Sequence, residues 1–423
     1  MTPQSFLTGF RRPWAGRPWL SLFATRPRFL ALAAFLFAGD LKADPRLAWV
    51  PVDLTLLTGA ILSLVLAARA ARGFRVASRA ALLLLGLWWL TFLPGVWGSV
   101  DSPYGVQKVA TLFSFTLLSA LAPLWLLGGE GDLRGMVNAL AGFCLAITLA
   151  GLFGAGHGEA RLQAFGSGTI ALGRATGLLF LHAVLALAEG PSAPIPVGKA
   201  VGSAVSWVRS GARLAKAGPF AVMTLAGIAA VFTGSRGPIV AALLVLLLVF
   251  GLGRQRLGRR GLELILAGGL LVALVAASLS FAPAGSLRRL DTFVHGQYGG
   301  SERYRVQALD QAWEQIRQAP AGLGWGRFAT RVDPEKGLGR QYPHNLLAEV
   351  ALEGGWACAA ATVLVLVTAV LIAWSRTASG VGRIAFSGLL FYLVNAMVSG
   401  DVNDNRPLFM FISSALALGE VRR

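Results

Sequence analysis

The chain has little charge: only 14% of its 423 residues are Asp, Glu, Lys or Arg, whereas 55% are hydrophobic. A soluble protein is typically about 25% charged, so this chain cannot cover a water-facing surface of ordinary size. The composition therefore excludes a soluble globular enzyme and a disordered chain. Negative charge is especially scarce, with 20 Asp and Glu against 38 Lys and Arg.

The chain also has few residues that could hold a metal or form a disulfide. Its two cysteines, Cys144 and Cys358, each lie inside an apolar run, which is typical of packing residues. No metal-spaced cluster of His, Asp and Glu and no Gly-x-Ser-x-Gly motif occurs, and the glycines near Gly324 lack the Lys-Ser/Thr of a phosphate loop. We therefore expect no metal and no cofactor.

Apolar segments long enough to cross a bilayer dominate the chain. A spanning helix needs about 20 mostly apolar residues, and by that criterion we predict about twelve spans. They lie near 20–39, 48–68, 79–98, 105–127, 134–153, 170–188, 218–234, 236–252, 261–282, 355–374, 384–400 and 405–420. The first is the weakest, and a cleaved signal peptide is its alternative. The sequence thus predicts an all-α integral membrane protein.

The basic residues predict the orientation of these spans. A net charge of +18 would favour nucleic acid as a partner in a soluble protein, but here most basic residues flank spans. With twelve spans, the clusters at Arg11 to Arg28, Arg69 to Arg79, Lys199 to Lys216, Arg254 to Arg260 and Arg376 to Arg383 lie on one side, together with both termini. The positive-inside rule makes this side cytoplasmic. We expect membrane lipids and no nucleic acid as partners.

One loop interrupts this pattern and divides the chain. Residues 282–343 are too long for a simple connector and carry basic residues on the predicted outer, periplasmic face. The organisation we predict is spans one to nine in 1–281, a periplasmic loop in 282–343, and a re-entrant helix with spans ten to twelve in 344–423, all in one membrane domain.

A helix is predicted within the loop. Ser301 can cap its start, Pro320 ends it, and Val306, Leu309, Trp313 and Ile316 form an apolar stripe on one face. Gly322, Gly324 and Gly326 then predict a flexible turn. Leu346 to Val350 predict a short helix before Gly354-Gly355 and span ten. Gly173 and Gly177 form a small-xxx-small pair, typical of close helix packing.

Ionisable and polar residues at the predicted outer membrane edge are the candidate site, because such groups are costly there. Arg236 follows a very short connector, for which snorkelling to lipid phosphate is the alternative. In the loop helix Arg305 follows Tyr304, with Arg303 as a competing choice and a solvated face as the alternative. The remaining candidates are Tyr342, His344 and Asn345 where the loop re-enters the membrane, Asp401 in the last outer turn, and Arg161, Arg174 and Lys108 near other outer ends.

These residue types together indicate phosphate chemistry. Guanidinium groups bind phosphate oxygens bidentately, so several arginines predict a lipid-linked phosphate or pyrophosphate. A histidine titrates near neutral pH and can take a proton from a hydroxyl, although a lone histidine is often structural. The Asp401 segment has a solvated turn as its alternative.

The motifs resemble the O-antigen ligase/polymerase superfamily. The resemblance rests on Arg236-Gly237 after a span, on Arg305-x3-Leu309…Trp313…Pro320-x-Gly322-x-Gly324, and on Pro343-His344-Asn345…Glu349…Gly354-Gly355, and it covers roughly 220–375. The earlier spans match in number and hydropathy only. Where the family often has Trp four residues after the loop arginine, this chain has Leu309, which keeps Arg303 as a register rival.

The resemblance implies an inverting glycosyltransferase of the metal-independent, all-helical GT-C type in the bacterial inner membrane. It would move O-antigen polysaccharide from undecaprenyl pyrophosphate to a sugar hydroxyl of the lipid A core, at the periplasmic face. By motif, His344 matches the family's loop histidine and would be the general base, while Arg236 and Arg305 would bind the pyrophosphate. The candidate substrate-binding residues are Arg161, Arg174, Lys108, Arg303, Asn345, Tyr342 and Asp401.

Other functions remain open at this point. An O-antigen polymerase or a protein O-oligosaccharyltransferase would use the same lipid-linked donor with another acceptor. A membrane transporter is the alternative from a different class, but transporters place charged residues near the bilayer midplane and often have internal repeats, neither of which is visible here.

Overall fold

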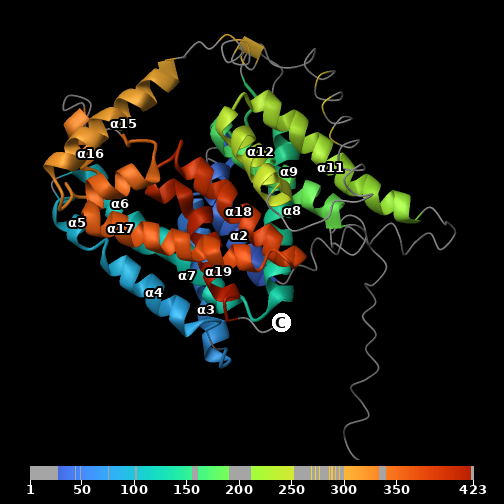
Figure 1. Cartoon of the computed structure of the whole chain (residues 1–423), viewed down its shortest axis with the longest axis horizontal. Helices are drawn as coiled ribbons and strands as arrows, with labels where there is room; N and C mark the ends of the chain where they lie inside the picture. Colours follow the sequence, from blue (N-terminus) through green and yellow to red (C-terminus); the bar gives the residue numbers. More distant parts are fainter. Residues whose placement is uncertain are drawn as a thin grey trace, which may run out of the picture.

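The computed structural model describes residues 27–420 apart from 43, 48, 75, 101, 155–160, 190–210, 333–339 and most of 252–299. This described part is helical and contains no β-strand (Figure 1), which agrees with an all-α membrane protein. The helices are α2 (Pro27–Leu41), α3 (Leu54–Ala71), α4 (Arg79–Leu90), α5 (Pro94–Trp97), α6 (Pro103–Thr111), α7 (Leu117–Leu126), α8 (Glu130–Gly154), α9 (Thr169–Glu189), α11 (Gly211–Thr233), α12 (Arg236–Gly251), α15 (Gly300–Gln318), α16 (Arg327–Val332), α17 (Leu346–Ser375), α18 (Gly380–Ala396) and α19 (Arg406–Leu418). Three short helical turns join them: η2 (Pro45–Leu47), the π-helical η3 (Leu112–Thr116) and η5 (Val402–Asn405).

Most of the predicted spans coincide with apolar helices. Six segments are long and apolar enough to cross a bilayer, namely Leu54–Ala71, Arg79–Trp97, Pro103–Leu126, Glu130–Phe153, Thr169–Ala188 and Leu346–Ser375. Gly218–Thr233, Arg236–Gly251 and Gly380–Ala396 are shorter apolar helices. The predicted span 261–282 lies almost wholly outside the described residues, so the total of about twelve remains a prediction.

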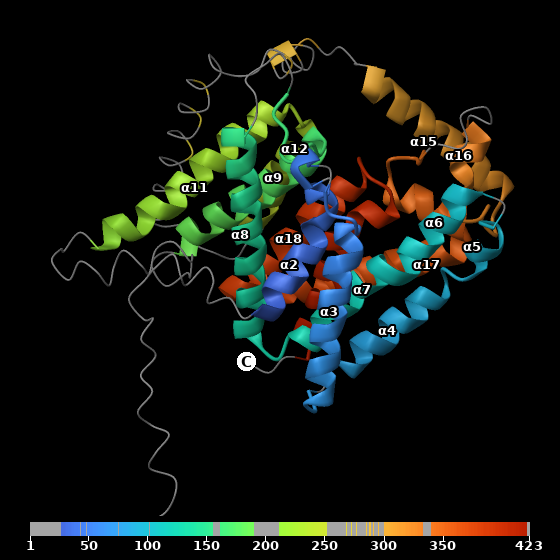
Figure 2. The ribbon, with the colours of Figure 1, turned by 180° about the vertical axis from the view of Figure 1, so that it is seen from behind.

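Two short helices form the centre of the bundle. Every residue from Leu408 to Leu418 in α19 is buried, and α2 buries most of its apolar side chains. Around this centre lie α7, α17, α18 and α3 (Figures 1 and 2). The outer helices α3, α4 and α17 expose leucines such as Leu64, Leu87 and Leu371, and an exposed apolar surface of this kind indicates contact with lipid.

The small-xxx-small pair on α9 brings three helices into close contact, as predicted. A Cβ atom at Gly173 would lie 2.9 Å from Ser235 Cβ, and one at Gly177 would lie 2.7 Å from the ring of Phe391. Glycine at both positions therefore lets α9 approach the start of α12 and the side of α18. This packing places the first turn of α12 next to the last turn of α18.

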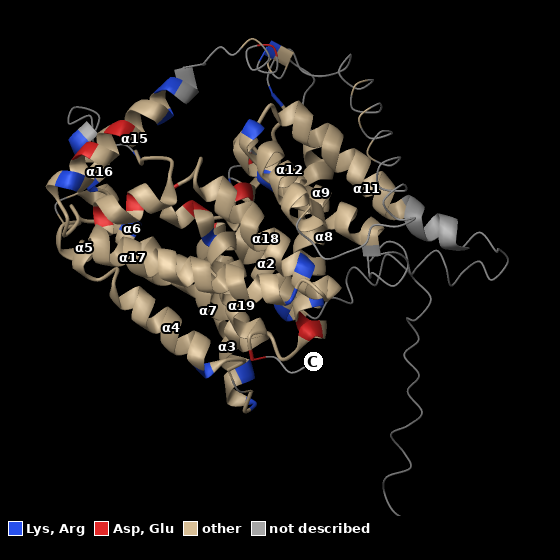
Figure 3. Cartoon of the chain, in the orientation of Figure 1, with Lys and Arg blue, Asp and Glu red and all other residues tan. Residues whose placement is uncertain are grey.

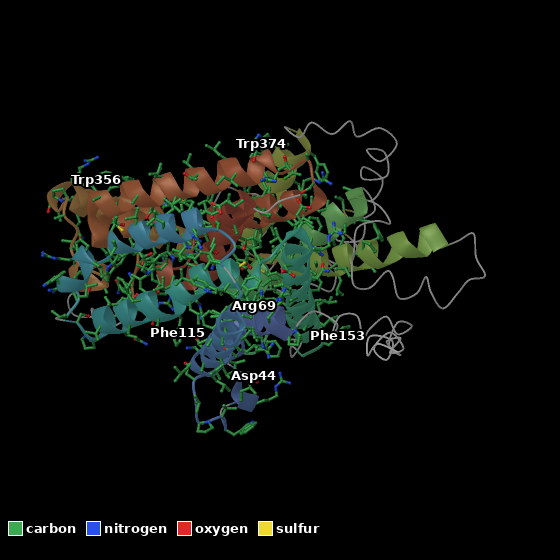
Figure 4. All side chains as sticks on the ribbon, turned by 90° about the horizontal axis from the view of Figure 1, so that it is seen from below. Asp44, Arg69, Phe115, Phe153, Trp356 and Trp374 are labelled. Carbon is green, nitrogen blue, oxygen red and sulfur yellow. The ribbon has the colours of Figure 1, made fainter. Side chains whose placement is uncertain are left out.

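Helix α17 contains the predicted re-entrant segment and a spanning segment, separated by a kink. Gly355 has φ of +86°, outside helical values, so residues 346–354 form a short helix before the longer one. Trp356 and Trp374 project outward near the two ends of the longer segment (Figure 4). The helix between them rises about 27 Å, close to the thickness of a hydrocarbon core, and tryptophan is typical of both interfaces.

The glycine segment Gly322–Gly326 is tightly packed, so the prediction of a flexible turn was wrong. Its three glycines all have positive φ, and a Cβ on any of them would come within 2.7 Å of backbone atoms. Backbone N–H groups of Leu323 and Gly324 donate to the carbonyls of Leu352 and Glu353, at 2.8 and 3.0 Å. Only glycine permits this close approach of two backbones, which holds the loop against the kink of α17.

Helix α15 packs on α17 through small side chains, which corrects the predicted apolar stripe. Ile316 is buried and Leu309 is partly buried against the core, as expected, but Val306 and Trp313 are exposed, and Ala308 and Ala312 are buried in their place. Alanine lets two helices approach more closely than valine or tryptophan can. The described helix begins at Gly300, so Ser301 lies inside it and not at its cap.

Candidate active site

The polar residues that the sequence singles out gather at one end of the bundle. Six segments meet at this end: the starts of α6, α9, α12 and α17, the ordered end of the long loop, and the turn before α19. In Figure 3, Lys and Arg concentrate on α15 and α16 and at helix ends, and the middles of α4 and α19 carry none. The charged residues thus lie mainly toward the ends of the helices, where some are exposed and others are buried and paired.

Asn345 begins α17 and attaches it to a second helix. Its side-chain oxygen accepts a hydrogen bond from the N–H of Ala348 at 3.0 Å, which caps the helix. Its Nδ2 donates to the carbonyl of Met397 at 3.1 Å, just after α18. Of the two neighbouring candidates, Asn345 is therefore the helix cap, and His344 precedes it.

His344 is held in an unusual backbone conformation. Its φ of +58° is one of two positive values for non-glycine residues in the described part of the chain; strain of this kind is concentrated at functional sites. Its ring lies against Tyr342 and Tyr304, with centroid separations of 4.4 and 5.9 Å. Burial, together with the positive charges of Arg305 and Arg340, lowers the pKa of His344 to about 4. The imidazole is therefore neutral near pH 7 and can accept a proton.

Arg340 fastens the segment that carries His344. Its guanidinium group contacts Asp401 at 2.9 Å and Asp404 at 2.6 Å, and its Nε also donates to Asp401. The Tyr104 hydroxyl donates to the same Asp401 oxygen at 3.3 Å. We call Arg340, Asp401 and Asp404 the loop clamp.

The two carboxyl groups of the loop clamp differ in their proton affinity. Burial and the nearby charge of Asp404 raise the pKa of Asp401. Burial also raises the pKa of Asp404, but Arg340 outweighs it, so that the pKa of Asp404 is lowered. Asp401 additionally accepts the N–H of Asp404 and so caps η5. The alternative of a solvated turn is therefore wrong for Asp401, which is buried and hydrogen-bonded.

A buried ion cluster joins α6 to the re-entrant part of α17. The ammonium group of Lys108 contacts Glu349 at 2.6 Å and forms a shorter contact with Glu353, and all three side chains are fully buried. Glu353 also accepts the N–H of Phe328 at 3.3 Å. Lys108 thus lies among carboxylates, and we call these three residues the Lys108 cluster.

The candidate arginines are distributed around this centre. Arg174 donates to the carbonyl of Ser399 at 2.8 Å, which ties α9 to the turn before α19. Arg236 is the first residue of α12, and a Cβ atom on the adjacent Gly237 would lie 3.4 Å from Val398. In α15 the charge of Arg305 acts on His344, whereas Arg303 is exposed. Arg161 lies in the loop before α9. The N–H of the next residue, Leu162, donates to the carbonyl of Phe232 at the end of α11.

A cavity of about 640 Å³ opens beside these residues. Small-molecule sites typically have volumes of about 300–1,000 Å³. Its polar lining comprises Asp40, Lys42, Asp53, Thr55, Tyr104, Gln107, Lys108, Thr111, Arg174, Arg340, Tyr342, Ser399, Asp401, Asn403, Asp404 and Arg406. His344 borders the cavity through Tyr342, while Arg236 and Arg305 are not part of its lining.

Several of these functional neighbours were missed from the sequence. The sequence predicts no role for Glu353, and Arg340 is only one of the basic residues of the long loop; Asp404 and Arg406 lie in the predicted outer turn around Asp401, without a role of their own. Each has a charged group in or beside an apolar segment, which was the available signal. Among the described residues, no group of three or more His, Cys, Asp or Glu side chains is placed to hold a metal ion.

Comparison with known protein families finds a match that includes part of the candidate site. Residues 221–363 match the family model described as O-antigen ligase. This region contains the start of α12, the whole of α15 and the segment from Arg340 through the kink of α17. A search of the curated proteins finds no match.

Proposed function

We propose that this protein belongs to the O-antigen ligase family, whose model matches residues 221–363, and that it transfers a glycan from a lipid-linked pyrophosphate donor to a hydroxyl of an acceptor sugar. The donor we propose is O-antigen on undecaprenyl pyrophosphate, and the acceptor is the lipid A core. The reaction would take place at the periplasmic face of the bacterial inner membrane.

The observation that carries this proposal is the setting of His344. It is a neutral imidazole at the membrane edge, held at positive φ by an Asn345 cap on one side and the loop clamp on the other. A cavity with the volume of a ligand site begins at its neighbour Tyr342. The charge of Arg305 reaches the same imidazole from α15. A base, a cation for phosphate and a space for an acceptor are therefore adjacent.

The proposed reaction is a single displacement. The acceptor oxygen transfers its proton to His344 and bonds to the anomeric carbon of the donor sugar. The bond from that carbon to the pyrophosphate oxygen breaks, and the configuration at the carbon inverts. Arg236 and Arg305 stabilise the charge that develops on the departing pyrophosphate. Pyrophosphate is already a good leaving group, so the donor needs no further activation. The two arginines add electrostatic stabilisation of the negative charge on the leaving group.

Variants of His344 and Arg236 test this assignment. We expect His344→Ala to lose about 10²–10⁴-fold in transfer rate, the usual contribution of a general base, with an unchanged unfolding temperature. His295→Ala is the matched control, because His295 is exposed elsewhere in the loop.

We expect Arg236→Lys to lose activity because lysine cannot bind phosphate bidentately, whereas Arg317→Lys on exposed α15 should retain it. The measurement is transfer by purified protein in nanodiscs, and near-normal transfer by His344→Ala would exclude the base role.

The acceptor distinguishes this function from the related ones. Deletion of the gene should leave lipid A core without O-antigen if the protein is a ligase. Core carrying one repeat unit would instead indicate a polymerase, and loss of glycosylated protein would indicate an oligosaccharyltransferase.

A further inference from the structure

The 640 Å³ cavity beside His344 is built for a ligand that both donates and accepts hydrogen bonds. Five basic and four acidic side chains line it, and hydroxyl and amide groups of Tyr104, Gln107, Thr111 and Asn403 lie between them. Apolar and aromatic faces of Phe37, Phe115 and Tyr392 complete the wall. Such a mixture suits a polyhydroxylated ligand, whose hydroxyls can donate to carboxylates and accept from guanidinium groups.

The same lining is unfavourable for a pyrophosphate. Four carboxylates face the space, and like charges within a few ångströms repel strongly in a partly buried site. The basic groups are in part already engaged: Arg340 by the loop clamp, Lys108 by Glu349 and Glu353, and Arg174 by the carbonyl of Ser399. Arg236 and Arg305, the proposed pyrophosphate ligands, do not line the cavity.

Polar groups without protein partners remain at the cavity. Nη1 of Arg406 and Nε of Arg174 are buried with no hydrogen-bond partner among the described residues. The side chain of Arg406 lies over the ring of Phe35 at 5.4 Å, in the middle of α2. Leaving such a group unsatisfied is costly, so the arrangement favours a polar occupant.

A local distortion of the spanning helix accompanies the cavity. The helix that contributes Tyr104, Gln107 and Lys108 becomes π-helical at Leu112–Thr116, and Phe115 of this turn lines the cavity. Thr116 donates to Asn403 at 2.7 Å, across to the turn before α19. Such π-helical turns frequently occur at functional sites, since they redirect side chains without ending the helix.

We propose that this cavity is the acceptor subsite and binds the saccharide whose hydroxyl is glycosylated. The inference rests on the proposed transferase function. His344 contacts Tyr342 of the cavity wall and Tyr304 of α15, which does not line the cavity. The base therefore stands between an acceptor sugar in the cavity and a donor pyrophosphate bound by Arg236 and Arg305. A hydroxyl held there can lose its proton to His344 while it attacks the donor.

Gly168 provides the sharpest test, because it lines the cavity and a Cβ atom on it would have no neighbour within 4 Å. A larger side chain at this position extends into open space and narrows the subsite without a clash. We expect Gly168→Leu to raise the apparent KM for the acceptor, a lipid A-core glycolipid that lacks O-antigen, by about tenfold or more, the equivalent of one or two lost hydrogen bonds. Gly168→Ser should have a much smaller effect. The KM for the undecaprenyl pyrophosphate-linked donor should not change.

One control variant and one further variant of the cavity complete the experiment. Gly131→Leu adds the same side chain at another open position, in the first turn of α8, and should leave both KM values unchanged. Gln107→Ala removes a lining amide that is not part of the Lys108 cluster or the loop clamp, and should raise the KM for the acceptor alone. A raised donor KM in Gly168→Leu, or no change in either KM, would overturn the inference.

Binding measured without transfer separates this inference from the proposed function. Delipidated core oligosaccharide should bind to His344→Ala in a calorimetric titration, and should bind more weakly when Gly168→Leu is added. Binding by the wild type without any transfer would contradict the transferase proposal, while transfer that is insensitive to Gly168→Leu would contradict the acceptor subsite.

Discussion

At the scale of single residues, His344 connects the sequence motif to chemistry. A histidine before Asn is unremarkable in composition, but its positive φ and its burial beside Arg305 make it a neutral and oriented imidazole. The strain of that backbone is offset by the Asn345 cap and by Arg340 of the loop clamp, four residues earlier. The burial of His344 and its position beside Arg305 thus keep its imidazole unprotonated at neutral pH.

The lowered pKa of His344 predicts an acid limb in the pH dependence of transfer. The base form disappears as pH falls through the pKa, so kcat/KM should fall only near pH 4 to 5, whereas an ordinary histidine would place the limb near pH 6.5. Bound pyrophosphate would compensate the charge of Arg305 and raise the pKa in the complex, so the limb of kcat should lie at higher pH than that of kcat/KM. Rates measured from pH 4 to 8, with an acid-stability control, check this. A kcat/KM limb at pH 6.5 would contradict it.

At the scale of elements, the loop clamp determines where the loop re-enters the membrane. We expect Arg340→Gln to lower kcat about 10–100-fold, the effect of a small misplacement of a catalytic group, because the segment from Tyr342 to His344 loses its attachment to the turn before α19. Arg340 acts by positioning, so hydrogen exchange of residues 340–345 should rise in parallel. Arg340→Lys should restore part of kcat through its charge. Unchanged exchange in Arg340→Gln would exclude the positioning role.

The Lys108 cluster predicts that the loss of its cation lowers the free energy of unfolding far more than the loss of an exposed ion pair does. Lys108→Met leaves Glu349 and Glu353 buried without a cation, and breaking a buried pair typically costs about 3–5 kcal/mol. The unfolding temperature in detergent should therefore drop strongly. Lys42→Met breaks an exposed pair with Asp53 and should cost at most about 1 kcal/mol.

Neutralising the partners provides the control for the Lys108 cluster. Adding Glu349→Gln and Glu353→Gln to Lys108→Met removes the uncompensated charge and should restore much of the unfolding temperature. Equal losses in the single and triple variants would mean that lost packing, and not charge, explains the effect.

At the scale of the whole molecule, polar groups gather at one end of the bundle, and the sides of the bundle expose apolar residues that indicate contact with lipid. The starts of α6, α9, α12 and α17 converge on the site, while leucines of α3, α4 and α17 face outward. With an even number of spans and the basic clusters on the cytoplasmic side, we predict that this end faces the periplasm.

Cysteine labelling tests this orientation on a clean background, because Cys144 and Cys358 are both buried. We expect Asp310→Cys, on exposed α15, to react with a membrane-impermeant maleimide in intact spheroplasts. Ala378→Cys, just after the far end of α17, should react only after permeabilisation. Reaction of both from the same side would contradict the predicted topology.

What the sequence alone determined is the set of properties that depend on nearby residues. Hydropathy over about 20 residues located most of the long apolar helices, the Asn345 to Gly355 spacing predicted a short helix before a break, and Gly173 with Gly177 predicted close packing. Two local patterns led to wrong predictions. The apolar spacing in α15 predicted that Trp313 is buried, and the glycines of residues 322–326 predicted flexibility, because the sequence does not show the backbone against which they pack.

The tertiary structure alone decided how the site is assembled. Arg340 and Asp401 are 61 positions apart, and Lys108 and Glu353 are 245 apart, so no spacing in the sequence reveals either contact. The cavity has the same origin, because its wall comes from the ends of helices spread from α2 to α19. Burial of these charges makes them costly unless they are paired, and only the fold brings their partners within reach.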